Sequence, residues 1–110
     1  MGDTNYFSGA VKLLEKPLQK VNKEKIIKSE FRGELYQTRQ NKIISLIFWG
    51  NLAHDVNNYY QINDYILIEG YTSIEKKYLD KENQKLTKLV VTVLKVYPIL
   101  LNSTHENKKH

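Results

Sequence analysis

The sequence predicts an all-β fold: a five-stranded barrel with one short helix between its third and fourth strands. Five segments alternate between apolar and polar residues with a period of two, the repeat of a half-buried strand. Only residues 52–60 carry apolar side chains at helical spacing, and an α/β fold needs more helices than that. The chain has 110 residues, 41% hydrophobic and 26% charged, which fits one small globular domain with no room for a second.

The first two strands are predicted at residues 6–14 and 26–37. The first ends before Pro17, because proline cannot donate a hydrogen bond to a ladder. A basic segment, residues 20–28, leads into the second strand. Alternation places one set of its side chains on the core face, Phe31, Gly33 and Leu35, and another on the opposite face, Arg32, Glu34 and Tyr36.

The third strand, residues 43–49, has the strongest pattern, and a helix is expected directly after it. Period two separates a core face of Ile44, Leu46 and Phe48 from an outer face of Ile43, Ser45, Ile47 and Trp49. Gly50 breaks the strand, and Asn51 is a suitable N-cap for the helix. The apolar positions of that helix are Leu52, Ala53, Val56, Tyr59 and Tyr60.

The last two strands are predicted at residues 65–72 and 87–97, with a Lys-rich arm, residues 73–86, between them. We expect Pro98 to stop the final strand, so that the domain spans residues 5–98 and residues 99–110 form a polar tail. Five strands with a helix between the third and fourth is the order of an OB-fold barrel. The other all-β interpretation, an SH3-like barrel, does not predict the helix.

Residues 48–70 resemble the central block of bacterial-type single-stranded DNA-binding proteins. Trp49, Ala53, Tyr59 and Gly70 stand at the offsets of that block without a gap. The similarity extends over residues 43–96, through an arm at 78–85 and a Val-rich strand at 89–93, and is weak over the first 42 residues. Asn63 and Asn83 stand where the family usually has Gly. The chain most resembles the short plastid-encoded members of red algae.

The C-terminus departs from the family pattern. Typical bacterial members end in an acidic, Phe-tipped segment that recruits other proteins, whereas this sequence ends in Lys108, Lys109 and His110. The resemblance therefore does not imply that recruiting role here.

The resemblance implies non-sequence-specific binding of single-stranded DNA, by base stacking on aromatic rings and by cationic contacts to phosphate. Trp49 occupies the base-stacking position, although it could instead pack in the barrel or a subunit interface. Tyr78 lies close to the family's aromatic on the arm, Tyr36 and Tyr71 could extend the platform, and Tyr59 is expected to anchor the helix. The candidate phosphate contacts are Arg32, Arg39, Lys76, Lys77, Lys85 and Lys88, each of which could also be an ordinary solvated side chain.

We expect no enzyme, no metal and no cofactor. The sequence has no cysteine, which excludes thiolate nucleophiles and Cys-ligated metals. His54, His105 and His110 lack the spacing of metal ligands. His54 and Asp55 are adjacent in sequence, so on a helix they point in different directions and form no dyad.

The composition also suggests where the protein acts. The net charge is +5, but 15 of the 17 cations are Lys, and Lys, Asn, Ile and Tyr are all abundant. These residues have A/T-rich codons, which indicates an A/T-rich genome such as that of an organelle. No secretory signal or membrane-length apolar stretch is evident. We expect the plastid stroma if the gene is organellar, otherwise the cytoplasm, and not secretion.

Three functions remain open at this point. The leading one is single-stranded DNA binding in organelle replication, recombination or repair, by a homo-oligomer, either a dimer or a tetramer. The alternatives are an OB-fold module that binds a protein partner and one that binds RNA. The apolar outer face of Ile43, Ile47 and Trp49 needs a cover, either nucleic acid or another subunit.

Overall fold

The computed structural model describes residues 5–35, 41–79 and 84–102. Its elements, in chain order, are β1 (Tyr6–Leu13), β2 (Gln19–Val21), β3 (Ile27–Leu35), β4 (Lys42–Trp49), α1 (Gly50–Tyr59), β5 (Tyr65–Leu79) and β6 (Gln84–Leu100). Among the described residues, no helix is long and apolar enough to cross a membrane.

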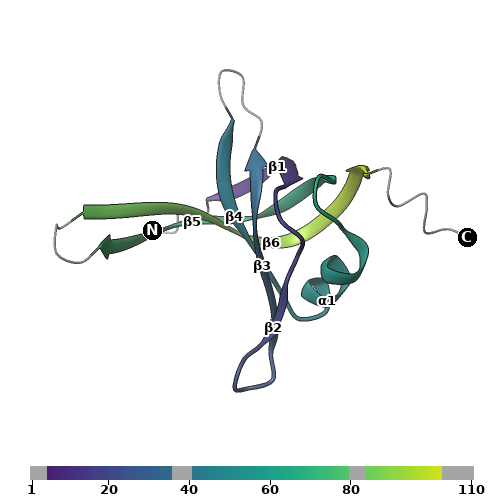
Figure 1. The fold of residues 1–110 in the computed structure, drawn as a ribbon, viewed down its shortest axis with the longest axis horizontal. Coiled ribbons are helices and arrows are strands. Elements are labelled where there is room, and N and C mark those ends of the chain that lie inside the picture. Colours follow the sequence, from purple (N-terminus) through teal and green to yellow (C-terminus); the bar gives the residue numbers. More distant parts are fainter. Residues whose placement is uncertain (1–4, 36–40, 80–83, 103–110) are drawn as a thin grey trace, which may run out of the picture.

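The strands close into a barrel, as the sequence predicts. The sheet order is β1-β5-β6-β4-β3-β2, and a further pairing of β1 with β3 joins the two sides of the sheet. Residues 6–12 of β1 pair with β5, whereas its last residues, Val11 to Leu13, also pair with β3. Among the strand pairs of the described residues, β4 and β6 alone run parallel, at Ser45–Ile47 against Val90–Thr92. Figure 1 shows the crossing strands at the centre, with α1 to one side and the β5–β6 arm extending away from it.

The core consists mainly of the faces that alternation predicts. One prediction is wrong: Ile47, expected on the exposed outer face of β4, is only 8% exposed, because β4 lies between β3 and β6 there. Phe31 and Phe48 stack with their ring centroids 5.3 Å apart and their planes 9° apart, so β3 and β4 are joined through aromatic packing. The helix closes this core with two fully buried side chains, Ala53 and Val56. The other buried apolar residues of the cluster are Val11, Leu13, Leu35, Ile44, Leu46, Tyr60, Ile66, Ile68, Val91 and Val93.

The helix differs from its prediction at both ends. It begins at Gly50, whose φ of 62° turns the chain directly out of β4, and its N-cap is Trp49 rather than Asn51. The prediction of Asn51 as N-cap is therefore wrong. At the other end, Tyr60 is 4% exposed and Tyr59 is 52% exposed, so the buried ring that anchors the helix belongs to Tyr60 and not to Tyr59.

The prediction missed one strand and ended another too early. The basic segment contains a short strand, β2, which pairs with the start of β3. Pro98 does not stop the last strand, which continues to Leu100 and pairs Pro98 with Ile66. Among the described residues, β6 pairs with β4 only at Val90–Thr92. One edge of β6 is therefore open at Pro98, and a residue without an N–H is tolerated there.

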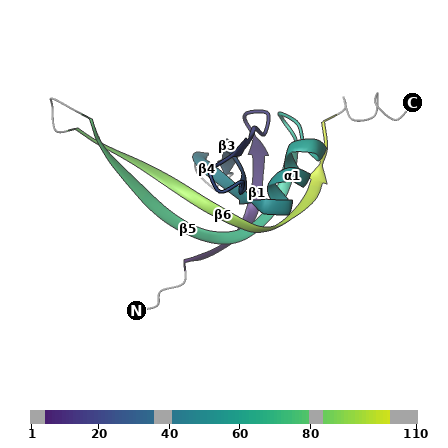
Figure 2. The same ribbon diagram turned by 90° about the horizontal axis from the view of Figure 1, so that it is seen from below.

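The β5–β6 arm is a two-stranded ribbon rather than an irregular loop. The two strands stay paired from Tyr65 with Leu100 to Leu79 with Gln84. Figure 2 shows the ribbon as one long curve that runs under the barrel and then projects beyond it. The predicted arm tip at residues 80–83, and residues 103–110 of the predicted tail, lie outside the described residues.

A buried carboxylate fastens the end of β6 to the loop before β5. Asp64 is fully buried, and its carboxylate accepts hydrogen bonds from the backbone N–H of Gln61 at 2.8 Å and of Asn102 at 2.6 Å. The Asn102 side chain donates to the Ile62 carbonyl oxygen at 3.0 Å. These bonds provide partners for backbone groups just beyond the ends of α1 and β6.

Candidate nucleic-acid interface

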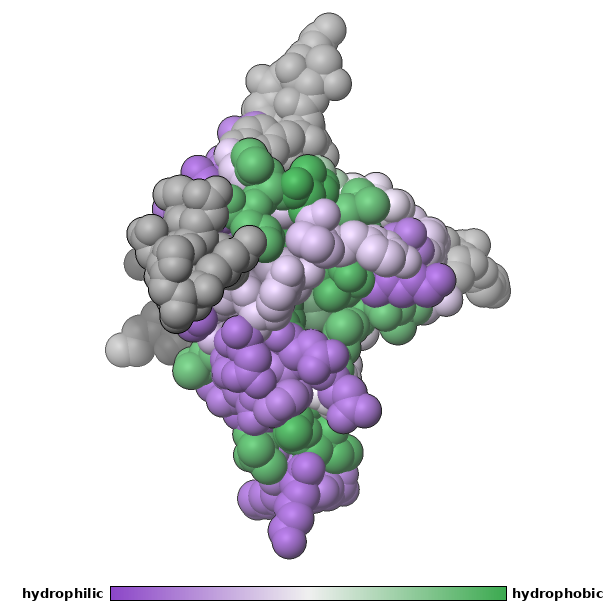
Figure 3. Space-filling model, turned by 90° about the vertical axis from the view of Figure 1, so that its right-hand side faces the viewer, coloured by the Kyte–Doolittle hydropathy of each residue, from purple (hydrophilic) through white to green (hydrophobic). Residues whose placement is uncertain are grey.

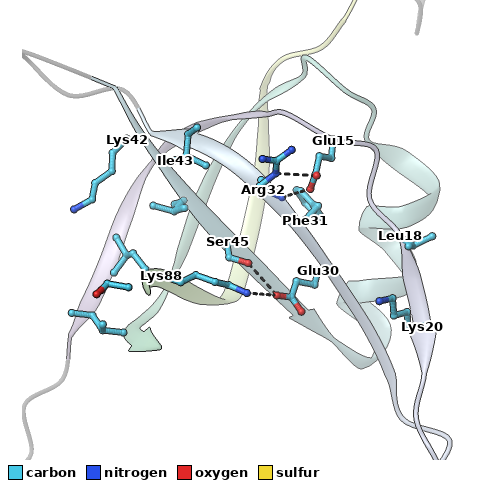
Figure 4. A pocket seen from close by; sticks show the side chains of 14 residues that line it. Glu15, Leu18, Lys20, Glu30, Phe31, Arg32, Lys42, Ile43, Ser45 and Lys88 are labelled. Carbon is cyan, nitrogen blue, oxygen red and sulfur yellow. Dashed lines mark hydrogen bonds and ion pairs between the residues drawn. The ribbon is translucent and has the colours of Figure 1, made fainter. Parts of the chain in front are cut away.

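A groove of ≈ 800 Å³ opens on the outer face of β3 and β4. One side is formed by Leu18 and Lys20, and the opposite side by residues of the β5–β6 arm (Figure 4). The groove therefore lies between the β1–β3 connection, which contains β2, and the base of the arm. Its lining residues are Glu15, Leu18, Lys20, Glu30, Phe31, Arg32, Lys42, Ile43, Ile44, Ser45, Ile74, Thr87, Lys88 and Leu89.

Strand alternation explains the polar floor of the groove. Phe31 faces the core, so its neighbours Glu30 and Arg32 project to the outer side of β3. Cross-strand pairing sets Arg32 opposite Ser45 of β4. The exposed side chain of Ile43 lies two residues from Ser45 on the same face. Charged and aliphatic side chains thus share one surface.

Trp49 stands at the end of the same face of β4 and is 44% exposed. It does not pack inside the barrel of its own chain, which removes one of the alternatives for this residue. Trp49 pairs with Lys28 across the strands, and Lys28 pairs in turn with Lys20 of β2. The Lys28 ammonium lies 5.4 Å from the centroid of the Trp49 ring, within the range of a cation–π contact.

Glu30 is the centre of the charged groups in the groove. Its carboxylate contacts the Lys28 Nζ at 3.3 Å and the Lys88 Nζ at 3.2 Å. It also accepts a hydrogen bond from the Ser45 hydroxyl at 3.2 Å. Partial burial opposes ionisation of Glu30, but the hydrogen bonds and charges of Lys88 and Lys28 outweigh it and lower the pKa of the carboxyl. Lys88 also lies 3.8 Å from a carboxylate oxygen of Glu75 on the arm.

A second carboxylate, that of Glu15, holds Arg32. The Arg32 backbone N–H donates to Oε1 at 2.7 Å, and the Arg32 Nε donates to Oε2 at 2.9 Å. The backbone hydrogen bond is the main reason that the pKa of Glu15 is lowered, with the guanidinium adding to it. The Arg32 side chain is still 61% exposed, so it stays accessible from the groove.

The structure brings together some of the residues predicted from sequence and separates others. Arg32 and Lys88 line the groove, whereas Trp49 is not a lining residue and stands further along the outer face of β4. Lys76 is exposed on the arm, opposite the groove residue Thr87. Tyr71 is not among the lining residues: it packs edge-on against Tyr6 of β1, with the ring centroids 5.6 Å apart.

Five further predicted residues cannot be placed. Tyr36 and Arg39 lie outside the described residues. Lys77, Tyr78 and Lys85 belong to the arm, where Tyr78 and Lys85 are cross-strand partners, but their side chains lie outside the described part of the chain.

Three cations of the site were missed by the sequence analysis: Lys20, Lys28 and Lys42. The signal for Lys28 was present, because it lies two and four residues before Glu30 and Arg32 and therefore shares their face of the strand. Lys20 had no such signal, since its place depends on the pairing of β2 with β3.

The comparisons with known proteins agree with this architecture. No family model matches the chain. It is 40% identical over 109 residues to a protein of Trieres chinensis named "Putative single-stranded DNA-binding protein ycf41", a match that covers 94% of this chain and 96% of the relative.

Solved structures show the same fold at low sequence identity. The crystal structure of the small single-stranded DNA-binding protein from Streptomyces coelicolor superposes with a TM-score of 0.78 at 11% identity, covering 90% of this chain and 97% of that one. The mitochondrial single-stranded DNA-binding protein Rim1 of S. cerevisiae gives 0.75 at 9% identity, covering 92% and 100%. The barrel is thus the OB-fold architecture that the sequence predicts. Because the match at 40% identity covers nearly all of this chain and of its relative, the chain belongs to the single-stranded DNA-binding protein family.

Proposed function

We propose that this protein binds single-stranded DNA without sequence preference, in the groove over β3 and β4. The observation that carries the proposal is the position of the groove. OB folds bind oligonucleotides on the face of their second and third strands, between the loop after the first strand and the loop before the last. Here β3 and β4 are those strands, and the β2 segment and the arm are those connections.

The side chains of the groove suit a nucleic-acid strand. Four cations line it against two carboxylates, Glu15 and Glu30, so its sign is positive; the cations are Lys20, Arg32, Lys42 and Lys88. These would contact phosphate, and the exposed ring of Trp49 would stack on a base. Stacking uses the π-face that every base presents, which is why no sequence preference is expected.

A titration of the protein with oligo(dT) tests the proposal. Trp49 is the sole tryptophan, so stacking on it will quench the fluorescence of the chain. Because phosphate contacts release counterions, affinity will fall steeply as salt is raised. Absence of both quenching and a gel shift at low salt would refute the proposal.

The substitution Trp49→Ala removes base stacking and keeps the cations of the groove, so it measures the contribution of stacking alone. Loss of one stacked base costs about 1–3 kcal/mol, so affinity for labelled oligo(dT), measured by anisotropy, will drop roughly five- to 150-fold. Tyr59→Ala is the matched control, because Tyr59 is 52% exposed and lies on α1 outside the groove lining. Equal losses in the two variants would contradict a specific role for Trp49.

The same experiments address the other functions left open by the sequence. Competition between oligo(dT) and oligo(U) distinguishes DNA from RNA, and a form that ignores both while retaining a protein partner would support the interaction module.

The proposal includes a homo-oligomer that acts in replication, recombination or repair. It also includes the plastid stroma, which the abundance of amino acids with A/T-rich codons supports.

A further inference from the structure

Two of the four cations that line the groove, Arg32 and Lys88, are already held by carboxylates of the same chain. Glu30 contacts Lys28 and Lys88 at once, and Glu15 holds Arg32. Figure 4 shows Glu30 on the groove floor with the Lys88 side chain reaching across to it from the arm. Glu75 is a third carboxylate beside these cations, 3.8 Å from the Lys88 Nζ.

A phosphate must compete with these carboxylates. It has oxygen acceptors like theirs and carries a negative charge, so Lys28, Lys88 and Arg32 would bind phosphate through the same N–H groups. Contact with a strand then requires the carboxylates to give up their partners. A carboxylate left behind in the groove also repels the incoming phosphate.

The ion pairs have the exposure that such exchange requires. The side chains of Glu30 and Lys88 are 33% and 38% exposed, so their pairing contributes little to the stability of the fold and is accessible to solvent and ligand. The two lysines and the serine hydroxyl that contact Glu30 come from β3, β4 and β6, and all three strands bound the groove. The carboxylate is therefore at the point where a bound strand would pass.

We propose that Glu30, assisted by Glu15, is an internal anion that occupies the cations of the groove until a phosphate displaces it, and so limits the affinity for a strand. This inference rests on the proposed function. It assigns Glu30 a regulatory role, since Glu30 itself makes no favourable contact with phosphate.

Glu30→Gln tests the inference in the full chain. Gln keeps the size of the side chain and a carbonyl oxygen for the Ser45 hydroxyl, but it removes the charge. Relief of one carboxylate–phosphate repulsion near the surface is worth roughly a tenfold gain in affinity for oligo(dT) at low salt. Because the gain is Coulombic, it will shrink as salt is raised. Glu69→Gln is the charge-matched control, since Glu69 is bonded to Tyr6 outside the groove lining and will give a much smaller gain.

Two further variants distinguish the occupation of specific cations by Glu30 and Glu15 from a general effect of removing negative charge. Glu15→Gln frees Arg32 and will also tighten binding, which provides a test that does not depend on the folding of the Glu30 variant. In a Lys88→Gln background the gain from Glu30→Gln will be smaller, because one of the two masked cations is gone.

The outcomes separate this inference from the proposed function. If wild-type protein binds oligo(dT) but the two Gln variants bind equally or more weakly, the inference is wrong and Glu30 instead positions its lysines. If the wild type and the variants all fail to bind at low salt, the proposed function fails and the inference with it.

Discussion

The proton on the Tyr6 hydroxyl is held by a single neighbour across the sheet. The hydroxyl donates to a carboxylate oxygen of Glu69 at 2.6 Å, and this bond is the main reason that the pKa of Tyr6 is raised to about 12. Burial likewise raises the pKa of Tyr60 to about 12, with the charges of Tyr59 and Asp64 adding to it. The unfolded chain loses these protons near pH 10. The stability that they contribute to the fold is therefore fully present below pH 10 and is lost as pH rises from 10 to 12.

Glu69→Gln removes the anion that holds the Tyr6 proton. We expect the pKa of Tyr6 to return toward 10, so that one tyrosine ionises earlier in an alkaline titration followed by phenolate absorbance. The pKa of Tyr60 will stay where it is, because burial is the main cause of its shift. A titration curve that superposes on the wild-type curve would show that the hydrogen bond does not hold the proton.

The backbone conformation of Asn63 explains why this residue can stand where the family usually has Gly. Its φ is 74°, in the left-handed region, where Gly is free of strain and Asn is tolerated better than most residues. Asn63 donates its backbone N–H to the Leu13 carbonyl oxygen at 2.8 Å, which fixes the turn before β5 against the end of β1. Asn in place of the usual Gly is therefore compatible with the conformation that the turn requires.

At the scale of elements, β5 depends on a close approach of two backbones at Gly70. The pairing of β5 with β6 shifts register between Glu69 and Gly70, close to where β5 leaves β1 and continues into the arm. A Cβ at Gly70 would lie 2.1 Å from the Thr92 carbonyl oxygen, a backbone atom that cannot turn aside. This contact gives a physical reason for the glycine at the end of the family's central block.

Gly70→Ala should accordingly destabilise the fold more than a typical glycine substitution. We expect a loss at the upper end of the about 1–3 kcal/mol that overpacking costs, measured by urea denaturation. Gly33→Ala is the control, because its Cβ would meet mainly a Leu46 methyl group at 3.0 Å, which can shift. A loss in Gly70→Ala no larger than in Gly33→Ala would contradict the close-approach argument.

At the scale of the whole molecule, apolar side chains remain uncovered outside the groove. Tyr6, Tyr71 and Tyr97 are each between 43% and 52% exposed, and Ile99 and Leu100 exceed 50%. Figure 3, which views the molecule from the right-hand side of Figure 1, also shows hydrophobic surface interspersed with hydrophilic surface. Exposed aromatic and aliphatic side chains in this number are typical of a surface that another molecule covers.

We therefore expect the protein to form a dimer or tetramer in solution. Light scattering in the absence of DNA will report two or four times the mass of one chain, because apolar surface is removed from water on association. Repeating the measurement with oligo(dT) will show whether the assembly persists when the groove is filled. A single-chain mass at micromolar concentration would contradict the expectation.

The sequence predicted only some residues of the candidate site, because local patterns do not show which distant segments pack together. Family resemblance pointed to Trp49, strand parity placed Arg32 on the outer face, and Lys88 was chosen as a cation next to the Lys-rich arm. Tyr71 was grouped with them by the same parity, but parity says nothing about which strand lies alongside, and the structure packs it against Tyr6. The partnership of Glu30 with Lys88, 58 residues apart, follows no local pattern at all.

The sequence by itself determined the class of fold, the order of its five main strands and its helix, and most residues of the core, because the alternation of side chains is a property of each strand alone. Only the tertiary structure decided that β2 forms, that β1 closes the barrel by pairing with both β3 and β5, and that β6 continues past Pro98. It also decided which carboxylate meets which cation in the groove. These features depend on the register between distant segments, which is set when the barrel closes and its strands are packed together.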